Sequence, residues 1–258
     1  MNSIIFLIRK TLRMSSNELQ FKNNNPGAVQ YGNFINYYEF NPPSNRITLL
    51  PSHIWSATPN TTEDTFLALD IGCNAGNLTH ELMCFLQKQL PQSTKLQILA
   101  VDIDPVLIER ARENYTTSNI QFETSDCTQS DFTLLIDNFL KNNKKTKFDA
   151  IFCFSTTMWI HLNHGDKGLQ EFLKNMTALC EMFVVEPQPW KCYTSAVKRM
   201  KGNIEFQHFK TLKMRVNVVK DIELFFTNEL NMIKVFESTK TEWKRIIFCF
   251  KHTSDQIN

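Results

Sequence analysis

A short run of acidic and glycine residues could bind a nucleoside. Asp70, Gly72 and Gly76 form the pattern D-x-G-x-x-x-G directly after the apolar residues 66–69. Glycine at such a turn can adopt positive φ, and without a Cβ it lets a ligand lie against the backbone. Asp102 follows a second apolar run, where a carboxylate can accept hydrogen bonds from both hydroxyls of a ribose. The alternatives left open are a glycine turn that only connects two elements and a loop acid that only caps a helix.

Two further stretches carry side chains that the fold itself does not require. In residues 155–166, His161, His164 and Asp166 have a spacing that a metal could use. Thiolates and further carboxylates are missing nearby, so we expect no metal site. In residues 186–193, two prolines favour extended backbone at the edge of the sheet. The side chains expected to project toward the ligand are Gln188, Trp190, Lys191 and Tyr193. The alternative is a core position for Trp190 and a solvated Lys191.

The elements that must position these residues alternate between strand and helix. Apolar runs predict strands at residues 66–69, 96–101, 120–123, 148–154 and 182–186, and a final hairpin at 232–237 and 243–250. Helices are predicted at residues 77–90, 106–115, 128–140, 168–180 and 217–229. Pro105 opens the second of these helices, with Asp104 as its cap. The pattern predicts an α/β fold, a Rossmann-like doubly wound sheet of seven mostly parallel strands with one antiparallel strand and helices on both faces.

Composition indicates one ordinary globular unit. The chain has 258 residues, of which 42% are hydrophobic and 21% charged, and its net charge is +2. This length suits a single well-buried core, so we expect one domain over residues 31–258. Because the net charge is small, contacts to nucleic acid must come from a local basic patch. The candidates for such a patch, with solvated surface positions as the alternative, are Lys198, Arg199, Lys201, Lys210, Lys213 and Arg215.

The first fifty residues divide into a polar leader and an aromatic arm. Residues 1–30 are expected to form a flexible leader. Residues 1–13 contain three basic side chains and no acid, so an organellar presequence is the alternative for them. Residues 31–50 are rich in tyrosine and phenylalanine. We expect this arm to lie over the ligand cleft, with substrate-side insertions at residues 155–167 and 187–215.

The cysteines and the hydropathy of the chain indicate the cellular compartment. The seven cysteines are scattered, with no C-x-x-C pair and an odd total, which favours neither a disulfide framework nor a zinc cage. They indicate a reducing compartment, and we expect the cytoplasm. No apolar run approaches the roughly 20 residues of a membrane span. We therefore expect no membrane span, and we also expect a monomer that binds neither a membrane nor DNA.

Several motifs resemble those of known methyltransferases. The glycine pattern is similar to the first loop of S-adenosylmethionine-dependent methyltransferases. The sequences MWIHLNHGDKGLQEFL and VVEPQPWKCY, together with YGNF, DIGCNAG and VDIDPVLIERA, resemble the bicoid-interacting-protein-3 domain of RNA 5′-phosphate methyltransferases. Within that family they resemble the branch that methylates the 5′-monophosphate of small RNAs, the pre-microRNA and histidine-tRNA enzymes. The resemblance covers residues 31–251.

The resemblance implies a class I methyltransferase fold, S-adenosylmethionine as cofactor with S-adenosylhomocysteine as product, and a small structured RNA with a 5′-monophosphate end as partner. It implies that Arg46 pairs with the methionine carboxylate. The other residues implied to hold the cofactor are Asp70, Gly72, Asn74, Asp102, Ile103, Asp126, Cys127 and Phe154. For Asp126 a helix cap is the alternative. The residues implied to donate hydrogen bonds to the phosphate are His161, Asn163, Gln188, Lys191 and Tyr193.

The implied reaction needs no general base. A terminal phosphomonoester is mostly dianionic at neutral pH, because its second pKa is about 6. The protein would need to hold a phosphate oxygen in line with the methyl group at about 3 to 3.5 Å and to exclude water. We expect 5′-triphosphate and 5′-hydroxyl ends to react poorly. The rival hypotheses are a methyltransferase of another acceptor, an RNA 5′-end binding module without turnover and, most weakly supported, a nicotinamide dehydrogenase.

Overall fold

The computed structural model describes residues 30–57, 64–200 and 205–252. The predicted leader, apart from its last residue, and the candidate presequence lie outside the described residues. Within the described part of the chain, no helix has both the length and the apolar content needed to cross a membrane.

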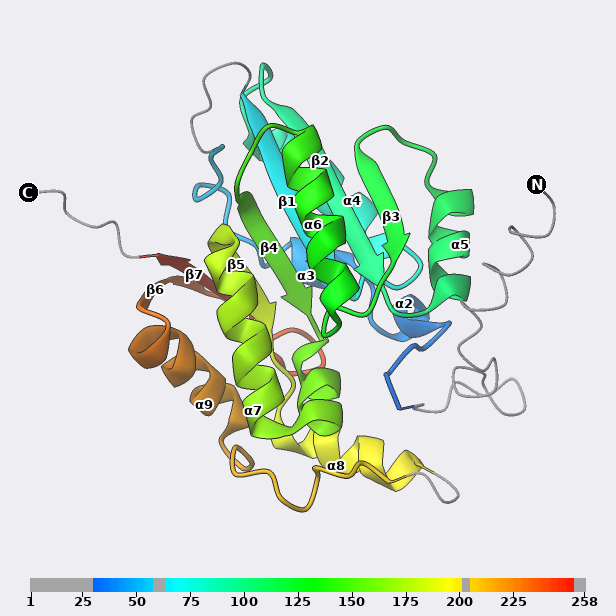
Figure 1. The fold of residues 1–258 in the computed structure, drawn as a ribbon, viewed down its shortest axis with the longest axis vertical. Coiled ribbons are helices and arrows are strands. Elements are labelled where there is room, and N and C mark those ends of the chain that lie inside the picture. The colour runs from blue at the N-terminus through cyan, green and yellow to red at the C-terminus, as the bar shows by residue number, and fades with distance from the viewer. Residues whose placement is uncertain (1–29, 58–63, 201–204, 253–258) are drawn as a thin grey trace, which may run out of the picture.

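A seven-stranded sheet forms the centre of the protein (Figure 1). Its strands are β1 (Thr65–Ile71), β2 (Lys95–Asp102), β3 (Ile120–Thr124), β4 (Phe148–Phe154), β5 (Cys180–Glu186), β6 (Met232–Glu237) and β7 (Phe248–His252). They are ordered β3-β2-β1-β4-β5-β7-β6. Strand β7 is antiparallel to both of its neighbours, and the first five strands are parallel. The predicted fold class is confirmed.

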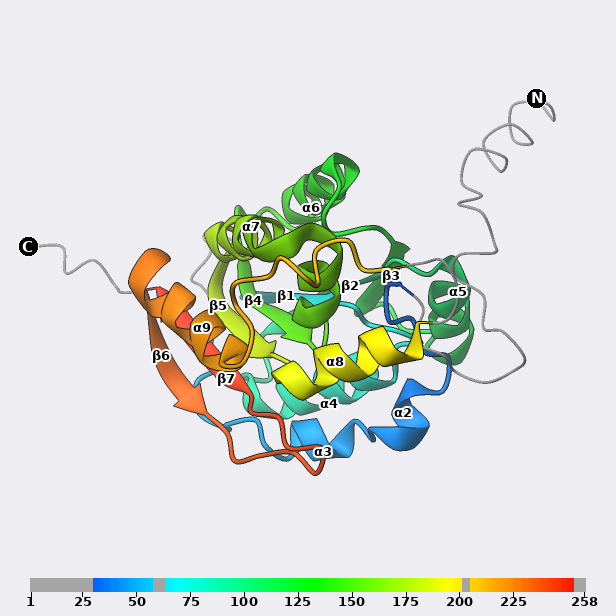
Figure 2. The same ribbon diagram turned by 90° about the horizontal axis from the view of Figure 1, so that it is seen from below.

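Helices cover both faces of the sheet. They are α4 (Asn77–Gln89), α5 (Pro105–Asn114), α6 (Ser130–Asn142), α7 (Thr157–Ala178), α8 (Trp190–Arg199), α9 (Val218–Leu224), the short α2 (Tyr37–Phe40) and α3 (Ser44–Ile47), and a π-helical turn at Phe225–Glu229. Figure 2 shows α6 and α7 on one side of the sheet and α4 on the other. The chain passes from β1 outward to β3 and then returns to β4, so the connections diverge between β1 and β4. In open α/β sheets ligands bind at the carboxyl ends of the strands beside such a point.

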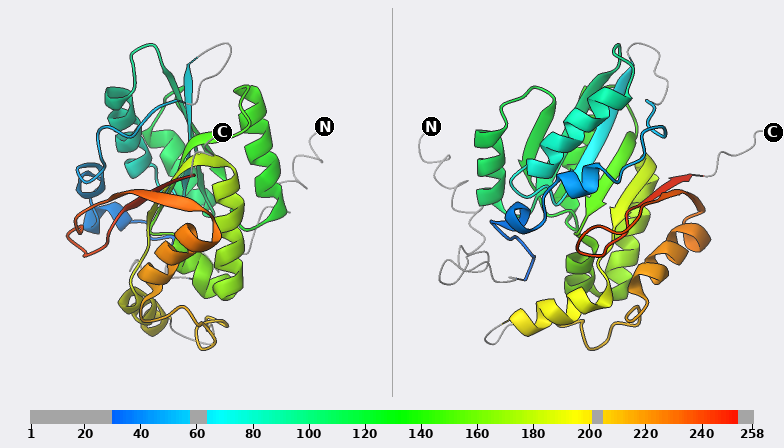
Figure 3. Two further views of the ribbon diagram at one scale, coloured as in Figure 1. Left: turned by 90° about the vertical axis from the view of Figure 1, so that its left-hand side faces the viewer. Right: turned by 180° about the vertical axis from the view of Figure 1, so that it is seen from behind.

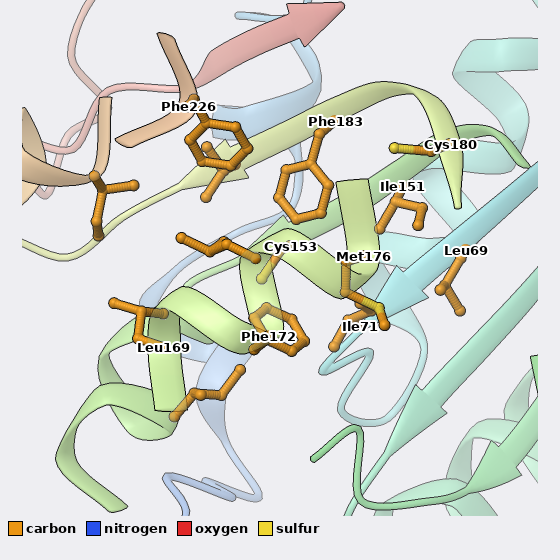
Figure 4. Close-up of a cluster of buried hydrophobic side chains, with 14 of the residues drawn as sticks. Leu69, Ile71, Ile151, Cys153, Leu169, Phe172, Met176, Cys180, Phe183 and Phe226 are labelled. Atoms are coloured by element: carbon orange, nitrogen blue, oxygen red, sulfur yellow. The ribbon is translucent and has the colours of Figure 1, made fainter. Parts of the chain in front are cut away.

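The central strands hold the sheet between two apolar layers. Every residue of β1 and of β4 is buried. Leu67, Leu69 and Ile71 belong to the layer beneath α6 and α7, whereas Phe66 and Ala68 belong to the layer beneath α4. Figure 4 shows the first layer, where Leu69 and Ile71 lie near residues of α7. Burying a leucine or phenylalanine side chain fully stabilises the fold by about 1.5–3 kcal/mol, so the strand ends that carry the polar residues are rigidly placed.

Two of the sequence predictions are wrong at helix boundaries. The sequence predicts no helix before residue 168 in this region, yet α7 begins at Thr157, and Gly165 bends it with φ 70° and ψ −176°. The two prolines predict extended backbone over residues 186–193, yet α8 begins at Trp190 after the extended Pro189. In α8 the residues Tyr193 and Ala196 are buried with helical spacing, so burial of this face favours the helix over the extended form.

Candidate functional site

A cavity lies at the carboxyl ends of the central strands, and we call it the strand-end cavity. Its empty space, including open solvent at its mouth, amounts to about 890 Å³. Its wall includes the β1–α4 turn, the end of β2, the loop after β3 and residues of the aromatic arm, among them Tyr31, Gly32 and Tyr38. The structure thus places the arm where the sequence predicts it, against the cleft.

The β1–α4 turn is built for close approach. Gly72 has φ 79°, and a Cβ there would lie 2.3 Å from Thr156 Oγ1, too close for any other residue to fit unless Thr156 moves. The backbone amide of Gly72 donates to Val101 O at 2.8 Å. Asn74 follows with φ 52°, and its Nδ2 donates to Phe34 O at 2.9 Å. The turn therefore ties β1 to β2 and to the arm, and both Gly72 and Asn74 line the cavity.

The carboxylate of Asp102 is fixed at the cavity wall. Its Oδ2 accepts a hydrogen bond from Asn74 N at 2.8 Å, and its Oδ1 accepts one from Asp104 N at 3.0 Å. Burial raises the pKa of Asp102 to about 6, although these hydrogen bonds to the charged form act in the opposite direction. Asp104 caps α5 by accepting from Val106 N, as predicted. The capping role therefore belongs to Asp104, and Asp102 is left to face the cavity with Ile103.

Asp70 differs from the other candidates because it is not among the residues that line the cavity. It is buried, and its Oδ2 accepts a hydrogen bond from Thr79 Oγ1 at 2.6 Å. Burial raises its pKa to about 6. The observed contact ties β1 to α4 from behind the glycine turn, so the structure gives Asp70 a positioning role in place of a direct contact.

The loop after β3 and the end of β4 complete the wall. Asp126, Cys127 and Phe154 all line the cavity. Asp126 Oδ1 accepts from Thr128 N at 2.9 Å and from Thr128 Oγ1 at 2.7 Å. The helix-cap alternative is wrong, because α6 begins at Ser130 after Gln129 and Asp126 instead stabilises the turn that precedes it.

Arg46 is a fully buried cation of the site. Its Nη2 donates to Glu186 Oε2 at 2.7 Å and to Ser155 Oγ at 2.8 Å. Burial opposes the charge of Arg46, but Glu186, Tyr37 and Tyr38 together outweigh this and raise its pKa. The buried Nη1 has no hydrogen-bond partner among the described residues, and Arg46 lines the cavity. A buried donor that lacks a partner costs about 1–3 kcal/mol, so this nitrogen fits a carboxylate that enters the cavity.

Glu186 and Ser155 connect Arg46 to a second arginine that the sequence analysis did not single out. Ser155 has φ 58°, and its hydroxyl donates to Glu186 Oε2 at 2.6 Å. Arg245, from the loop between β6 and β7, donates through Nη1 to the same hydroxyl. Trp243 from that loop donates to Glu186 Oε1 at 2.7 Å. Although burial raises the pKa of Glu186, Arg46 and Arg245 together hold it below its usual range.

A second hollow, which we call the groove, opens beside the cavity and shares Tyr37, Ser155 and Trp159 with it. Its aromatic residues come from the arm and α7, and they are Phe34, Tyr37, Phe40 and Trp159. Its cations come from α8 and from the β6–β7 loop, and they are Lys191, Arg199 and Arg245. Figure 3 shows α8, which supplies Lys191 and Arg199 to the groove, beyond the carboxyl ends of the strands.

Four of the five predicted phosphate donors make hydrogen bonds inside the protein, and three of these four line neither hollow. His161 Nδ1 lies 3.0 Å from Tyr193 Oη, and His161 Nε2 lies 3.2 Å from Asp166 Oδ1. Burial lowers the pKa of His161. Gln188 Oε1 accepts from Met158 N at 3.2 Å. His161, Gln188 and Tyr193 line neither hollow, and they join the start of α7 to α8.

The other two predicted donors lie on the two hollows. Asn163 lines the cavity, and its Nδ2 already donates to Gln30 O and to Trp159 O, each at 2.8 Å. Lys191 lines the groove. Among the described residues no group of three histidine, cysteine, aspartate or glutamate side chains is arranged to hold a metal ion.

The sequence signals for the residues that were missed are weak. Arg245 and Trp243 stand in a short segment that follows β6 and precedes β7, far in sequence from the other site residues. Only the antiparallel placement of β7 beside β5 brings their loop to Glu186. The sequence predicts a strand over residues 243–250, and this is wrong for Trp243 and Arg245, because β7 is Phe248–His252 and both residues lie in the loop before it. A single sequence also does not predict which strand end this loop will meet.

Comparison with known proteins connects this geometry to a family. Residues 148–252 match the model of bicoid-interacting protein 3 (Bin3), and residues 69–181 match a methyltransferase domain. A pre-miRNA 5′-monophosphate methyltransferase of Xenopus laevis is 40% identical over 240 residues, which cover 88% of this chain and 93% of that protein. An RNA 5′-monophosphate methyltransferase of Homo sapiens is 38% identical over 239 residues, covering 88% of this chain and 82% of that protein.

Solved structures of other proteins show which fold class this chain has. The crystal structure of the CurJ carbon methyltransferase superposes with a TM-score of 0.52 at 13% identity, over 76% of this chain and 50% of that chain. This likeness shows a methyltransferase fold. The match to the Bin3 model runs from β4 to β7, so it includes α8 and the β6–β7 loop. The chain therefore belongs to the Bin3-domain family of RNA 5′-monophosphate methyltransferases.

Proposed function

We propose that this protein transfers a methyl group from S-adenosylmethionine to the 5′-monophosphate of a small structured RNA. The observation that carries the proposal is that the strand-end cavity and the groove meet at Ser155, with the unpartnered Nη1 of Arg46 on the cavity side and Lys191 on the groove side. A nucleoside site that opens into a cationic groove suits a donor and an anionic acceptor. The curated relatives named for this reaction support the assignment.

The residues of the cavity fit the cofactor. Arg46 Nη1 would take its carboxylate and Asp102 its ribose hydroxyls. The other residues proposed to hold it are Gly72, Asn74, Ile103, Asp126, Cys127 and Phe154, with Asp70 supporting the turn from behind. When bound, the cofactor supplies an electrophilic methyl group on a sulfonium. What the chain adds is binding, orientation and the exclusion of water.

The proposed acceptor, a 5′-phosphate, needs to be positioned but does not need to be deprotonated by the protein. A phosphomonoester carries a second negative charge above a pKa of about 6, so no side chain has to remove a proton. We propose that Lys191 contacts the RNA end, whereas Asn163, whose Nδ2 donates to Gln30 O and Trp159 O, ties residue Gln30 to α7. His161, Gln188 and Tyr193 would act as positioning residues. Gln188 Nε2 donates to Ser155 O, so it fixes the backbone at the junction of the two hollows.

The proposal extends to the oligomeric state, the compartment and the partners of the protein. We propose a monomer in the cytoplasm that binds neither DNA nor a membrane. All seven cysteines are free, which suits a reducing compartment. Size-exclusion chromatography with light scattering tests the oligomeric state, and a mass near twice 30.1 kDa would contradict the monomer.

The central experiment compares the ends of one RNA. The purified full chain is incubated with S-adenosylmethionine labelled in the methyl group and with small RNAs that differ only in a 5′-monophosphate, 5′-triphosphate or 5′-hydroxyl. We expect transfer to the monophosphate to be about tenfold or more faster than to either other end, because the missing charge or the extra bulk is worth at least 1.4 kcal/mol in the barrier. The Asp102→Asn variant should lose transfer while keeping the fold by circular dichroism. Equal labelling of the three RNAs would overturn the proposal, and labelling at a base or at a 2′-hydroxyl would assign another acceptor.

A further inference from the structure

We infer that Arg245, supplied by the loop between β6 and β7, is the residue that grips the terminal phosphate of the RNA and makes the enzyme select a 5′-phosphate end. This inference rests on the proposed function and assigns its acceptor side. It begins with the place of Arg245 at the junction of the two hollows. Arg245 lines the groove, and its Nη1 donates to Ser155 Oγ, which lies where the groove meets the cavity.

The guanidinium of Arg245 has N–H groups that donate to no strong acceptor within the described residues. Its Nη1 contacts Ser155 and lies 3.5 Å from Tyr37 Oη. Its Nη2 has only the weak acceptor Cys192 Sγ at 3.9 Å, and its buried Nε has no hydrogen-bond partner among the described residues. A guanidinium forms paired hydrogen bonds with phosphate or carboxylate through two of its nitrogens. Nε and Nη2, which are left without strong acceptors, are therefore the pair that can recognise an oxyanion.

The surrounding charges leave this arginine available. Arg46 and Arg245 share one carboxylate, but not equally. Arg46 contacts Glu186 Oε2 at 2.7 Å, whereas Arg245 Nη1 lies 3.8 Å from the same oxygen. Two ionised guanidiniums and one carboxylate leave a net positive charge around Ser155. Arg46 makes its contacts within the cluster and toward the cavity, so the surplus charge faces the groove through Arg245.

The loop that carries Arg245 is held in place by neighbours. Trp243 donates to Glu186 Oε1 at 2.7 Å, and the guanidinium of Arg46 lies 4.8 Å from the Trp243 ring. The backbone amide of Arg245 donates to the hydroxyl of Thr241 at 2.9 Å. Figure 2 shows this loop beside α3, which carries Arg46. An arginine held this firmly loses little entropy when it binds a phosphate.

Three variants test the assignment. Arg245→Gln removes the charge, Arg245→Lys keeps the charge but removes the paired donors, and Lys244→Gln is the matched control. Lys244 is the adjacent exposed cation, with φ 63°, and neither hollow includes it. Kd is measured for one small RNA with a 5′-monophosphate or a 5′-hydroxyl, in the presence of S-adenosylhomocysteine, along with kcat/KM for methyl transfer and the melting temperature.

We expect wild type and Lys244→Gln to prefer the phosphorylated end by about tenfold or more. Arg245→Gln should weaken binding of the phosphorylated RNA by about 10- to 100-fold, since a charge-assisted hydrogen bond is lost, and leave the 5′-hydroxyl RNA within about twofold. Arg245→Lys should fall between them. Affinity for S-adenosylhomocysteine should stay within about twofold in each variant, because Arg46 holds that side.

The outcomes separate the inference from the proposed function. If Arg245→Gln keeps the full preference for the phosphorylated end, or weakens both RNAs equally, the inference is overturned while the proposed function stands. If wild type itself shows no preference, the proposed function is contradicted and the inference with it. If Arg245→Gln fails to fold, Arg245→Lys decides: a preference equal to that of wild type overturns the inference, and a reduced one supports it.

Discussion

At the scale of single residues, the site depends on charges that the fold keeps buried. Arg46 and Glu186 are both fully buried and lie 2.7 Å apart. Such a pair contributes little net stability, but removing one partner strands the other at a cost of about 3–5 kcal/mol. The unpartnered Nη1 of Arg46 shows that the pair is not complete by itself. Ligand binding and folding therefore draw on the same cluster of side chains.

Asp102 should make cofactor binding depend on pH. Its pKa in the folded protein is raised by burial from 3.8 to about 6. In the proposed complex a ribose hydroxyl donates to the ionised carboxylate, so binding should be strongest above about pH 6 and weaken by up to about tenfold for each pH unit below it. The effect of Asp102 on folding stability depends on pH in the opposite direction to its effect on binding. Because its pKa is higher in the folded than in the unfolded protein, Asp102 favours folding below pH 3.8, and this contribution is lost as the pH rises through about 6.

Calorimetric titration with S-adenosylhomocysteine on both sides of this pKa checks the prediction. Asp102→Asn should bind about 10- to 100-fold more weakly on the alkaline side and show a flatter pH profile. Asp137→Asn, at an exposed aspartate of α6, is the matched control and should follow wild type. A variant profile as steep as that of wild type would show that another group titrates.

At the scale of elements, α7 and α8 form the junction between cavity and groove. Gln188 joins them, since its Oε1 accepts from Met158 N and its Nε2 donates to Ser155 O. His161 and Tyr193 make a second connection further along α7. The polar residues that a sequence suggests as catalytic can thus serve to hold two helix starts together.

Gln188→Ala should destabilise the protein by about 1–2 kcal/mol, because the first turn of α7 loses its cap and a buried amide is left without its partner. Urea unfolding monitored by circular dichroism measures this. Gln87→Ala, at an exposed position of α4, should change the free energy of unfolding by less than about 0.5 kcal/mol. The methyl transfer rate of Gln188→Ala should also fall. A rate equal to that of wild type would show that Gln188 does not act as a positioning residue for the reaction.

The central strands β1 and β4 could be predicted from the sequence because they are buried on both faces. The run Phe148–Phe154 has the same bounds in the structure as in the prediction. The glycine turn and Asp102 were also found, since a strand that ends in glycine or acid leaves a local signal. The start of α7 was missed because Ser155 and two histidines obscure an apolar face whose Met158 and Leu162 are buried at helical spacing.

The role of Arg245 could not be predicted, because it depends on contacts across the chain. Arg245 and Ser155 are 90 residues apart. Nothing local to a loop arginine shows whether it meets solvent or a buried carboxylate. For the same reason the sequence could not show that His161 and Tyr193, 32 residues apart, satisfy each other and are not free donors.

At the scale of the whole molecule, the net charge is small and the basic side chains that could bind RNA are clustered in one place. The chain has 28 basic and 26 acidic residues, a net charge of +2, so long-range attraction of RNA is weak. Three cations of the groove, Lys191, Arg199 and Arg245, lie together beside the junction. RNA binding should therefore show a shallow dependence on salt.

The slope of log K against log salt should be about −2, which is the value for three phosphate contacts on a single strand at about 0.7 each. Arg199→Gln should reduce the magnitude of this slope by about 0.7 without changing the preference for a 5′-phosphate, since Arg199 lies further along α8. Fluorescence anisotropy over a series of potassium chloride concentrations measures both quantities. A slope several times steeper would mean that the RNA covers a larger basic surface.

The position of β7 has a consequence for how the protein is made. This strand follows all the others in the described part of the chain, yet it lies between β5 and β6 inside the sheet, and Arg245 shortly precedes it. A chain still emerging from the ribosome can assemble β1 to β5 and the glycine turn, but it has neither the inserted strand nor the arginine. Methyl transfer should thus begin only after β7 has emerged and entered the sheet, so a nascent chain that lacks β7 should not modify RNA.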